Sequence, residues 1–259
     1  RKSGMQVYHR RQWDPQAGKR IAEEAVEKAV ELLKASPISG GKLPVVLDEY
    51  MAPRFLGMFF GAFSAESAQR GMSRLQGRLG ETIAIPELNL LDDPHRQGAN
   101  RSCFLDAEGF LTKPLPLIEE GVFRNFLYHV ESANKENKSS TGHAVRGYSG
   151  GIGTRSHNLV WPTGEFSLEQ LCAQNSKCLL VTQLEGQAGC NPVSGDISIG
   201  VQGFLIENGL RIQPVDSITL AGNFFDVMLN IRGSGNTYQP ELAHSFIPAL
   251  LIEGLTVSG

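Results

Sequence analysis

The chain has 259 residues, of which 41% are hydrophobic and 20% charged, and its net charge is −3. This length suits one large domain or two small ones, with enough apolar material for a substantial core. The slightly acidic balance does not imply a basic patch of the kind that binds nucleic acid, and no apolar run reaches the about 18 residues that a membrane-spanning helix needs. We therefore expect neither a nucleic-acid partner nor a membrane partner.

The first predicted elements lie in residues 1–42. Met5–His9 is predicted as a short strand, and Asp14–Ala35 as an amphipathic helix with Asp14 at its N-cap. The helix is indicated by apolar residues at helical spacing: Ile21, Ala25, Val26, Ala29, Val30 and Leu33. Ser36–Lys42 is predicted as a loop. Because the chain begins at Arg1 rather than at Met, we expect an N-terminal region to be missing from this numbering.

An apolar segment with two glycines follows a predicted strand at Leu43–Leu47. Met51–Ser73 is predicted as one helix, and it contains no histidine. Gly57 and Gly61 lie four residues apart in it, where alanine would favour a helix more strongly. Two glycines at this spacing let another backbone approach closely, so our main interpretation is tight core packing. The alternative is that this helix also shapes a cleft for a peptide or a partner.

Beyond residue 80, short apolar runs are separated by Gly, Pro, Asn and Asp, a pattern typical of strands and turns. Strands are predicted at Thr82–Ile85, Leu88–Leu91, Leu115–Ile118, Phe123–Tyr128, Leu159–Trp161, Leu179–Leu184, Ile197–Ile206, Leu210–Val215 and Ile218–Leu220. Hairpins are predicted at Glu119–Phe123 and at Phe204–Ile212, where the pair Asn208-Gly209 suits a type I′ turn.

Two short helices interrupt these strands. Ser167–Cys172 is predicted as a helix with a capping box formed by Ser167 and Gln170, and Asn223–Ile231 as a second helix. Because strands dominate, helices are few and no alternation of strand and helix appears, we predict an α+β fold. Its main part is expected to be an antiparallel sheet or a partly closed barrel with a few packed helices.

No short motif in the sequence carries catalytic chemistry by itself. The six histidines include no pair at helical ligand spacing, and HExxH and GxSxG are absent. A metal site would therefore need residues that lie far apart in the sequence. The run Asp92-Asp93-Pro94-His95 is compatible with a ligand cluster, but we interpret it as a turn that ends a strand.

Two loops supply further candidates. Ser139–Gly153 is rich in Gly and Ser, and we interpret it as a mobile loop, with a peptide-binding, active-site or phosphate-binding loop as alternatives. Cys190 is a candidate nucleophile if the fold brings His143 or His157 close to it as a base, and otherwise a cysteine in a turn. Candidate residues of a peptide cleft are His143, Arg146 and Asn191.

The four cysteines are Cys103, Cys172, Cys178 and Cys190. They form no CxxC pair, which disfavours a zinc ribbon and a thioredoxin-like function. Their irregular spacing in a chain of this size favours reduced thiols, and no signal peptide is visible. We therefore expect a cytoplasmic protein.

The order and spacing of several short motifs resemble those of the TldD/PmbA family, also called modulator of DNA gyrase or peptidase family U62. The motifs are Asp92-Asp93-Pro94, Ser140–Ala144, Asn191–Asp196, Gly203–Gly209, Pro214-Val215 and Ile218–Asn223. The resemblance spans about residues 40–259. It implies that residues 1–42, with a helix at about 14–35 and a linker, are the tail of an N-terminal α/β domain. Residues 43–259 would then be the C-terminal domain of a TldD/PmbA-like protein.

The active branch of this family, TldD, is implied to be a zinc metallopeptidase with an HExxxH motif. Superposing Gly71-Met72-Ser73 on the family's residues after that motif puts Leu56 and Gly61 at the histidine positions and Gly57 at the glutamate position. A later cysteine of the family falls near Asn236–Tyr238, where this chain has none. The resemblance therefore implies the PmbA (TldE) branch, with no metal or other cofactor in this chain and with zinc in a TldD-like partner.

Three functional hypotheses follow. The first is a PmbA/TldE-type subunit of a cytosolic metallopeptidase complex, which pairs with a TldD-like subunit and holds an extended peptide during proteolysis or peptide processing. The second is an autonomous hydrolase with relocated catalytic residues, drawn from His143, His157, Cys190 and Asp196. The third is a non-enzymatic homodimeric scaffold, in which an exposed sheet edge captures an extended peptide.

Overall fold

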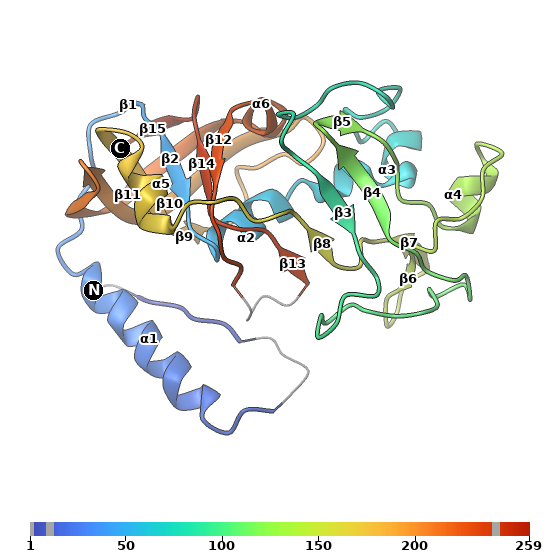
Figure 1. The fold of residues 1–259 in the computed structure, drawn as a ribbon, viewed down its shortest axis with the longest axis horizontal. Helices are drawn as coiled ribbons and strands as arrows, with labels where there is room; N and C mark the ends of the chain where they lie inside the picture. Colours follow the sequence, from blue (N-terminus) through green and yellow to red (C-terminus); the bar gives the residue numbers. More distant parts are fainter. Residues whose placement is uncertain (1–2, 9–12, 240–243) are drawn as a thin grey trace.

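The computed structural model describes residues 3–8, 13–239 and 244–259, and it consists of two β-sheets with short helices around them. In Figure 1 the larger sheet lies on the left and the smaller one on the right. The larger sheet curls as an open half-barrel, and its edge strands β1 (Gly41–Lys42) and β12 (Ile231–Ser234) are not paired with each other. The α+β class with a mainly antiparallel, partly closed sheet is thus confirmed.

The larger sheet has eight strands, of which only β2 and β9 pair in parallel. Between its edge strands it contains, in spatial order, β15 (Thr256–Ser258), β11 (Leu210–Asn223), β10 (Asp196–Glu207), β9 (Lys177–Glu185), β2 (Val45–Leu47) and β14 (Leu250–Ile252). Strands β10 and β11 form a long hairpin, and its register shifts once near Gln202 and once near Leu205.

The smaller sheet has five strands, and a separate two-stranded hairpin lies beside it. The sheet is ordered β13 (Ser245–Phe246), β8 (Leu159–Val160), β3 (Leu90–Asp92), β4 (Leu115–Glu119) and β5 (Val122–Phe123), and the hairpin is β6 (Ala144–Arg146) with β7 (Ile152–Thr154). The helices are α1 (Ala17–Glu31), α2 (Met51–Gly57), the 3-10 turn η1 (Phe60–Phe63), α3 (Ala65–Gln69), α4 (Val130–Asn134), α5 (Leu168–Ala173) and α6 (Phe224–Leu229).

Three predictions that rest on contacts within a few residues are confirmed. The turn between β10 and β11 has positive φ at both Asn208 (51°) and Gly209 (77°), as a type I′ turn requires. The hairpin between β4 and β5 likewise has positive φ at two successive residues, Glu120 (47°) and Gly121 (77°). Helix α5 is held by the predicted capping box, in which the Ser167 Oγ accepts a hydrogen bond from the Gln170 N–H.

The single helix predicted over Met51–Ser73 is wrong, because the chain bends twice in this region. Helix α2 ends at Gly57, and Ser64 is extended (ψ 126°) and caps α3, its Oγ accepting from the Ser67 N–H. The bends allow buried aromatic rings to reach different parts of the core. The Phe59 ring stacks on Phe224 at 4.8 Å between centroids, while Phe63 meets Phe123 edge-on at 5.7 Å.

Several other predicted elements are wrong in extent. Residues 5–8 are irregular rather than a strand, and His9 lies outside the described residues. Helix α1 is shorter than Asp14–Ala35 at both ends, and its N-cap is Gln16, with no capping side chain. Thr82–Ile85 forms only one isolated bridge, since Ile83 and Ala84 both donate to the Gly121 carbonyl oxygen in a turn.

Further corrections concern the second half of the chain. Phe123–Tyr128 contributes to a strand only at Phe123, and the two strands predicted between Leu210 and Leu220 are one continuous strand, β11. The loop predicted at Ser139–Gly153 largely forms the β6–β7 hairpin. The short strands β12 to β15 were not predicted.

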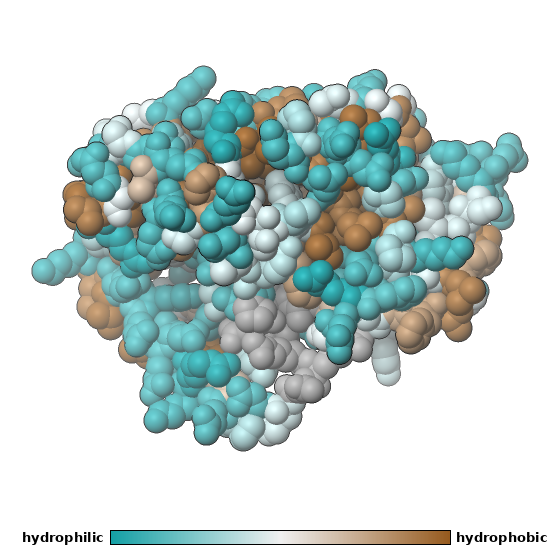
Figure 2. All heavy atoms as spheres, viewed as in Figure 1, coloured by the Kyte–Doolittle hydropathy of each residue, from teal (hydrophilic) through white to brown (hydrophobic). Residues whose placement is uncertain are grey.

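The outer surface carries no extended apolar face in the view of Figure 2, which shows a largely hydrophilic face with separate hydrophobic patches. Among the exposed apolar side chains, four lie on the loop between β3 and β4: Phe104, Leu105, Phe110 and Leu111. No helix in the described part of the chain is long and apolar enough to cross a membrane.

Asp48 links β2 to α2 and is expected to make the stability of the fold depend on pH. Its carboxylate is buried and accepts hydrogen bonds from the N–H groups of Tyr50 and Met51. Burial raises the pKa of Asp48 from 3.8 to about 6, against the lowering effect of these bonds. An acid whose pKa is raised by folding stabilises the fold below its unfolded pKa, and this contribution is lost as the pH rises through the folded pKa.

We therefore expect wild-type stability to fall by about 2–3 kcal/mol as the pH rises from about 4 to above 6. Asp48→Asn keeps the cap oxygen but cannot ionise, so it should remove this slope and raise stability at neutral pH by a similar amount. Urea unfolding followed by circular dichroism across this range measures both effects. An unchanged slope in the variant would contradict the assignment to Asp48.

Candidate functional site

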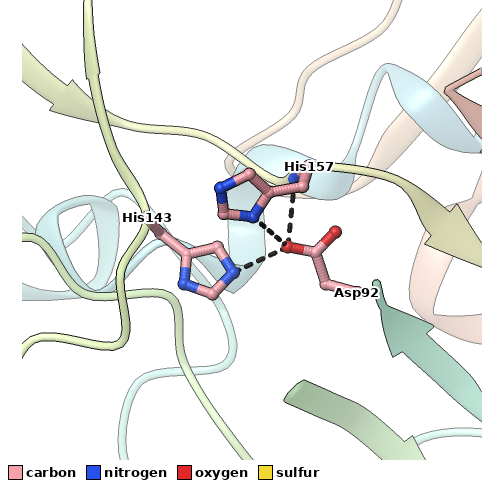
Figure 3. Close-up of side chains that lie close together, drawn as sticks. All are labelled: Asp92, His143 and His157. Carbon is pink, nitrogen blue, oxygen red and sulfur yellow. Dashed lines mark hydrogen bonds and ion pairs between the residues drawn. The ribbon is translucent and has the colours of Figure 1, made fainter. Parts of the chain in front are cut away.

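Two neighbouring features form the candidate site: a buried cluster of one aspartate with two histidines, and a pocket beside it. Asp92 ends β3, His143 precedes β6, and His157 lies between β7 and β8. Residues that are far apart in the sequence thus meet at one point between the small sheet and the β6–β7 hairpin (Figure 3). Within the described chain, this cluster is the only group of three side chains placed to hold a metal ion.

One carboxylate oxygen organises the cluster. The Asp92 Oδ2 lies 2.6 Å from the His143 Nε2, 3.0 Å from the His157 Nδ1 and 3.0 Å from the His157 backbone N. The Asp92 side chain is fully buried, and its second oxygen, Oδ1, has no hydrogen-bond partner. Burial works to raise the pKa of Asp92, but the hydrogen bonds from the two histidines outweigh it and lower this pKa to about 2.

The ionised carboxylate fixes the orientation of both imidazole rings. Because it can only accept, the His143 Nε2 and the His157 Nδ1 donate to it. The His143 Nδ1 lies 2.8 Å from the Thr141 Oγ1, so both nitrogens of this ring are engaged. The second nitrogen of His157 points away from Asp92 (Figure 3), and His157 lines a cavity of about 370 Å³. Only His157 therefore offers a nitrogen to a ligand.

The contacts within this cluster are those of hydrogen bonds rather than of a metal centre. Two ligands held about 2.0–2.1 Å from a tetrahedral zinc ion lie about 3.3 Å apart. The 2.6 Å separation of the Asp92 Oδ2 and the His143 Nε2 is much shorter. A metal ion at this point would also need to displace the ring protons that now form hydrogen bonds to the carboxylate.

The adjacent pocket has a volume of about 470 Å³ and is bounded by α2, η1, the segment after β7 and the loop between β3 and β4. The residues that matter for its chemistry are Arg54, Gly57, Gly61, Arg101, Arg155 and His244. This volume lies within the range of ligand pockets, about 300–1,000 Å³. The pocket shares Arg101, Arg155 and Ser156 with the cavity that His157 lines, so the two hollows share a wall.

Gly57 and Gly61, which were predicted to allow close backbone packing, face open space instead. A Cβ atom added at Gly57 or Gly61 would meet nothing within 4 Å, and both residues line the pocket. The interpretation as tight core packing is therefore wrong, and the glycines open the pocket instead. Leu56, the third position aligned with the zinc motif, is fully buried in the core and does not line the pocket.

The described wall of the pocket does not fit zinc. Protein zinc sites use at least three ligands from His, Cys, Asp and Glu. Among the lining residues only His244 belongs to these types, since Gly57 and Gly61 have no side chain and no Asp, Glu or Cys lines the pocket. The remaining polar groups are guanidinium and hydroxyl groups, which favour an anionic or peptide ligand.

Substituting these glycines tests whether the space is open. Gly57→Ala and Gly61→Ala are expected to leave stability unchanged or to raise it by up to about 1 kcal/mol, because alanine favours a helical backbone and finds no clash. Gly203→Ala is the matched control, since its Cβ would lie 1.8 Å from the Leu180 carbonyl oxygen in the centre of the sheet. Thermal unfolding should separate the two groups clearly. A loss of stability at Gly57 or Gly61 comparable to that of the control would mean that the pocket is not open.

Three other predicted site residues lie in a different part of the fold from His143 and His157. They are Cys190, Asn191 and Asp196. Cys190 packs against the main core at the turn before β10, in the other sheet. In that turn the Asn191 Oδ1 accepts from the N–H groups of Val193 and Ser194, and Asp196 is bound by Ser194 and Asn223. The described structure thus does not assemble the cysteine hydrolase centre that we considered.

The predicted cleft residues are also divided between two places. Arg146 lines the same cavity as His157, whereas His143 is buried behind it and Asn191 belongs to the turn before β10. The sequence did not indicate Arg54, Arg101 or Arg155, which carry no motif. The sequence indicated that Asp92 lies in a turn at the end of a strand. It did not indicate that Asp92 pairs with two histidines.

This chain is similar in sequence to known proteins. The profile of the family described as PmbA/TldA metallopeptidase C-terminal domain matches residues 40–259. A protein named Metalloprotease PmbA homolog from Haemophilus influenzae is 34% identical over 240 residues, which cover 92% of this chain and 51% of that protein. Metalloprotease PmbA from Escherichia coli O157:H7 is 32% identical over 223 residues, covering 86% and 47% respectively. The chain therefore spans about half the length of these curated relatives.

Solved structures show the same fold. A proposed modulator of a DNA gyrase from Thermotoga maritima superposes with a TM-score of 0.85 at 32% identity, over 94% of this chain and 56% of that chain. TldE from Thermococcus kodakarensis superposes with a TM-score of 0.80 at 27% identity, over 93% of this chain and 55% of that chain.

Proposed function

The chain belongs to the PmbA/TldD metallopeptidase family, and we propose that within it the chain acts as a PmbA/TldE-type subunit. In this role it pairs with a TldD-like subunit in the cytosol and holds an extended peptide. The partner supplies zinc and hydrolysis, and the complex acts in proteolysis or peptide processing. The placement of residues 1–42 in an N-terminal domain and the cytosolic location remain predictions from the sequence.

The observation that carries this proposal is the wall of the pocket at α2 and η1. A metallopeptidase site needs metal ligands and a base, and the described wall offers neither a carboxylate nor a thiol, and only one imidazole. The same wall is open, of ligand size and rich in hydrogen-bond donors. These features suit a chain that binds a peptide without cleaving it, and the similarity to a structure named TldE agrees with this role.

Co-expression with a TldD-like protein from the same genome tests the proposal. We expect the two chains to co-purify, peptidase activity to require both, and zinc to be bound only when the TldD-like chain is present. Equal activity with and without this chain would refute the subunit role. About one zinc per chain in protein purified alone would refute the absence of a metal site, and its loss in His143→Ala would place that zinc at the Asp92 cluster.

Filling the pocket tests whether it takes part in peptide handling. Gly61→Trp should lower the activity of the complex several-fold while co-purification persists, because the new side chain occupies the pocket and not the core. Gly18→Trp is the matched control, since Gly18 is also an open position but lies on α1, outside the pocket. Equal activity of the two variants would show that the pocket is not used.

A further inference from the structure

Three arginines from separate segments converge on the pocket beside α2. Arg54 lies on α2, Arg101 on the loop between β3 and β4, and Arg155 directly after β7. No acidic residue lines the pocket within the described chain. In that part of the chain, none of the three guanidinium groups forms an ion pair, although many other arginines do, for example Arg78 with Glu81.

This arrangement concentrates positive charge where solvent is partly excluded. Arg101 is half-buried, and its pKa is lowered by burial first and by the charge of Arg155 second, while the charge of Asp92 acts to raise it. Asp92 is buried and already accepts three hydrogen bonds from the two histidines. The repulsion between Arg101 and Arg155 disfavours the folded state, so a ligand with negative charge would relieve it.

The pocket also has an apolar side. Phe60, Leu127 and Leu159 line it together with the arginines, and the space at Gly57 and Gly61 is open. On the other side of Arg101 and Arg155 lies the cavity that Arg146 lines. A ligand that combines an anionic group with an apolar neighbour and an extended shape fits this lining better than a free inorganic anion does.

We propose that the pocket is a specificity site that binds a carboxylate of an extended peptide through Arg54, Arg101 and Arg155. The planar guanidinium group pairs with a carboxylate through two parallel hydrogen bonds, which a lysine ammonium group cannot match. The carboxylate belongs either to the C-terminus of the peptide or to a Glu or Asp side chain, and the apolar wall takes the neighbouring side chain. This inference rests on the proposed peptide-holding function and names the class of peptide that the chain prefers.

Binding of fluorescent peptides to the full chain tests the proposal. Four short peptides of equal length are needed: one with an internal Glu and an amidated C-terminus, one with a free C-terminus and no acidic residue, one with neither carboxylate, and one with Lys in place of Glu. Fluorescence anisotropy should show binding of at least one of the first two that is about tenfold or more tighter than binding of the neutral peptide. Which of the two binds identifies the source of the carboxylate.

Arginine variants then locate the site. Arg101→Gln and Arg155→Gln should each weaken binding of the preferred peptide by about tenfold and leave binding of the neutral peptide unchanged. Arg101→Lys keeps the charge but loses the two parallel hydrogen bonds, so it should recover only part of the affinity. Arg78→Gln is the matched control, because Arg78 pairs with Glu81 away from the pocket and its loss should change neither affinity. Thermal unfolding of each variant checks that it is folded.

Several outcomes would overturn the proposal: equal affinity for neutral and acidic peptides, unchanged affinity in folded Arg101→Gln and Arg155→Gln, or competition by inorganic phosphate as strong as that by the peptide. The result is separable from the subunit test. Loss of the acidic preference in arginine variants that still co-purify with a TldD-like partner concerns only the specificity site. Arginine-dependent peptide binding by a chain that never associates with such a partner would refute the subunit role and leave the site in place.

Discussion

Asp92→Ala is expected to destabilise the protein by about 3–5 kcal/mol at neutral pH. The carboxylate is fully buried and accepts hydrogen bonds from three N–H donors, two on imidazole rings and one on the backbone of His157. Removing it leaves these donors unpaired in the interior and opens a small cavity beside β3. Urea unfolding followed by circular dichroism measures the loss.

Asp93→Ala is the matched control, because this neighbouring carboxylate is only half-buried and accepts one hydrogen bond, from the His95 N–H. We expect it to cost no more than about 1 kcal/mol. Equal effects of the two substitutions would show that the buried hydrogen bonds of Asp92 do not hold this part of the fold together.

The pH dependence of stability provides a second signature of Asp92. Its pKa is lowered by folding from 3.8 to about 2, so its contribution is present above the unfolded pKa and is lost as the pH falls through the folded value. This amounts to about 2 kcal/mol lost between about pH 4 and pH 2. Asp48 acts in the opposite direction and in a different window, between about pH 4 and 6, so the two groups can be told apart in one titration.

Phe59→Ala should be about as damaging, with an expected loss of about 3–5 kcal/mol. The Phe59 ring is fully buried, stacks on Phe224 and meets Phe55 edge-on at 6.2 Å. It joins the bend between α2 and η1 to α6, so its removal leaves a cavity where three segments meet. Chemical unfolding measures the effect.

Phe60→Ala serves as the control, since the adjacent Phe60 is only partly buried and lines the pocket. It should cost clearly less stability and instead change peptide binding. A larger loss of stability in Phe60→Ala than in Phe59→Ala would contradict the placement of Phe59 in the core and of Phe60 at the pocket.

The sequence predicted the elements whose geometry depends on neighbouring residues. The turn at Asn208-Gly209 follows from two positions that need positive φ, and the cap of α5 from Ser167 and Gln170 three residues apart. The α+β class follows from many short apolar runs with few helices. The strands β12 to β15 were not predicted. Each has between two and four residues, which is too few for the alternation of buried and exposed side chains to identify a strand without its partners.

By itself, the sequence therefore determined the family resemblance, the fold class and the absence of a zinc motif along Met51–Ser73. The tertiary structure alone decided what that segment does. Core rings at Phe224 and Phe123 draw the segment into two bends, which turn Gly57 and Gly61 towards open space. The structure alone also brought together Asp92 and His143, which are 51 residues apart, and three arginines with no common motif. The physical reason is that hydrogen bonding and ring packing act through space between distant residues, and local spacing along the chain carries no record of them.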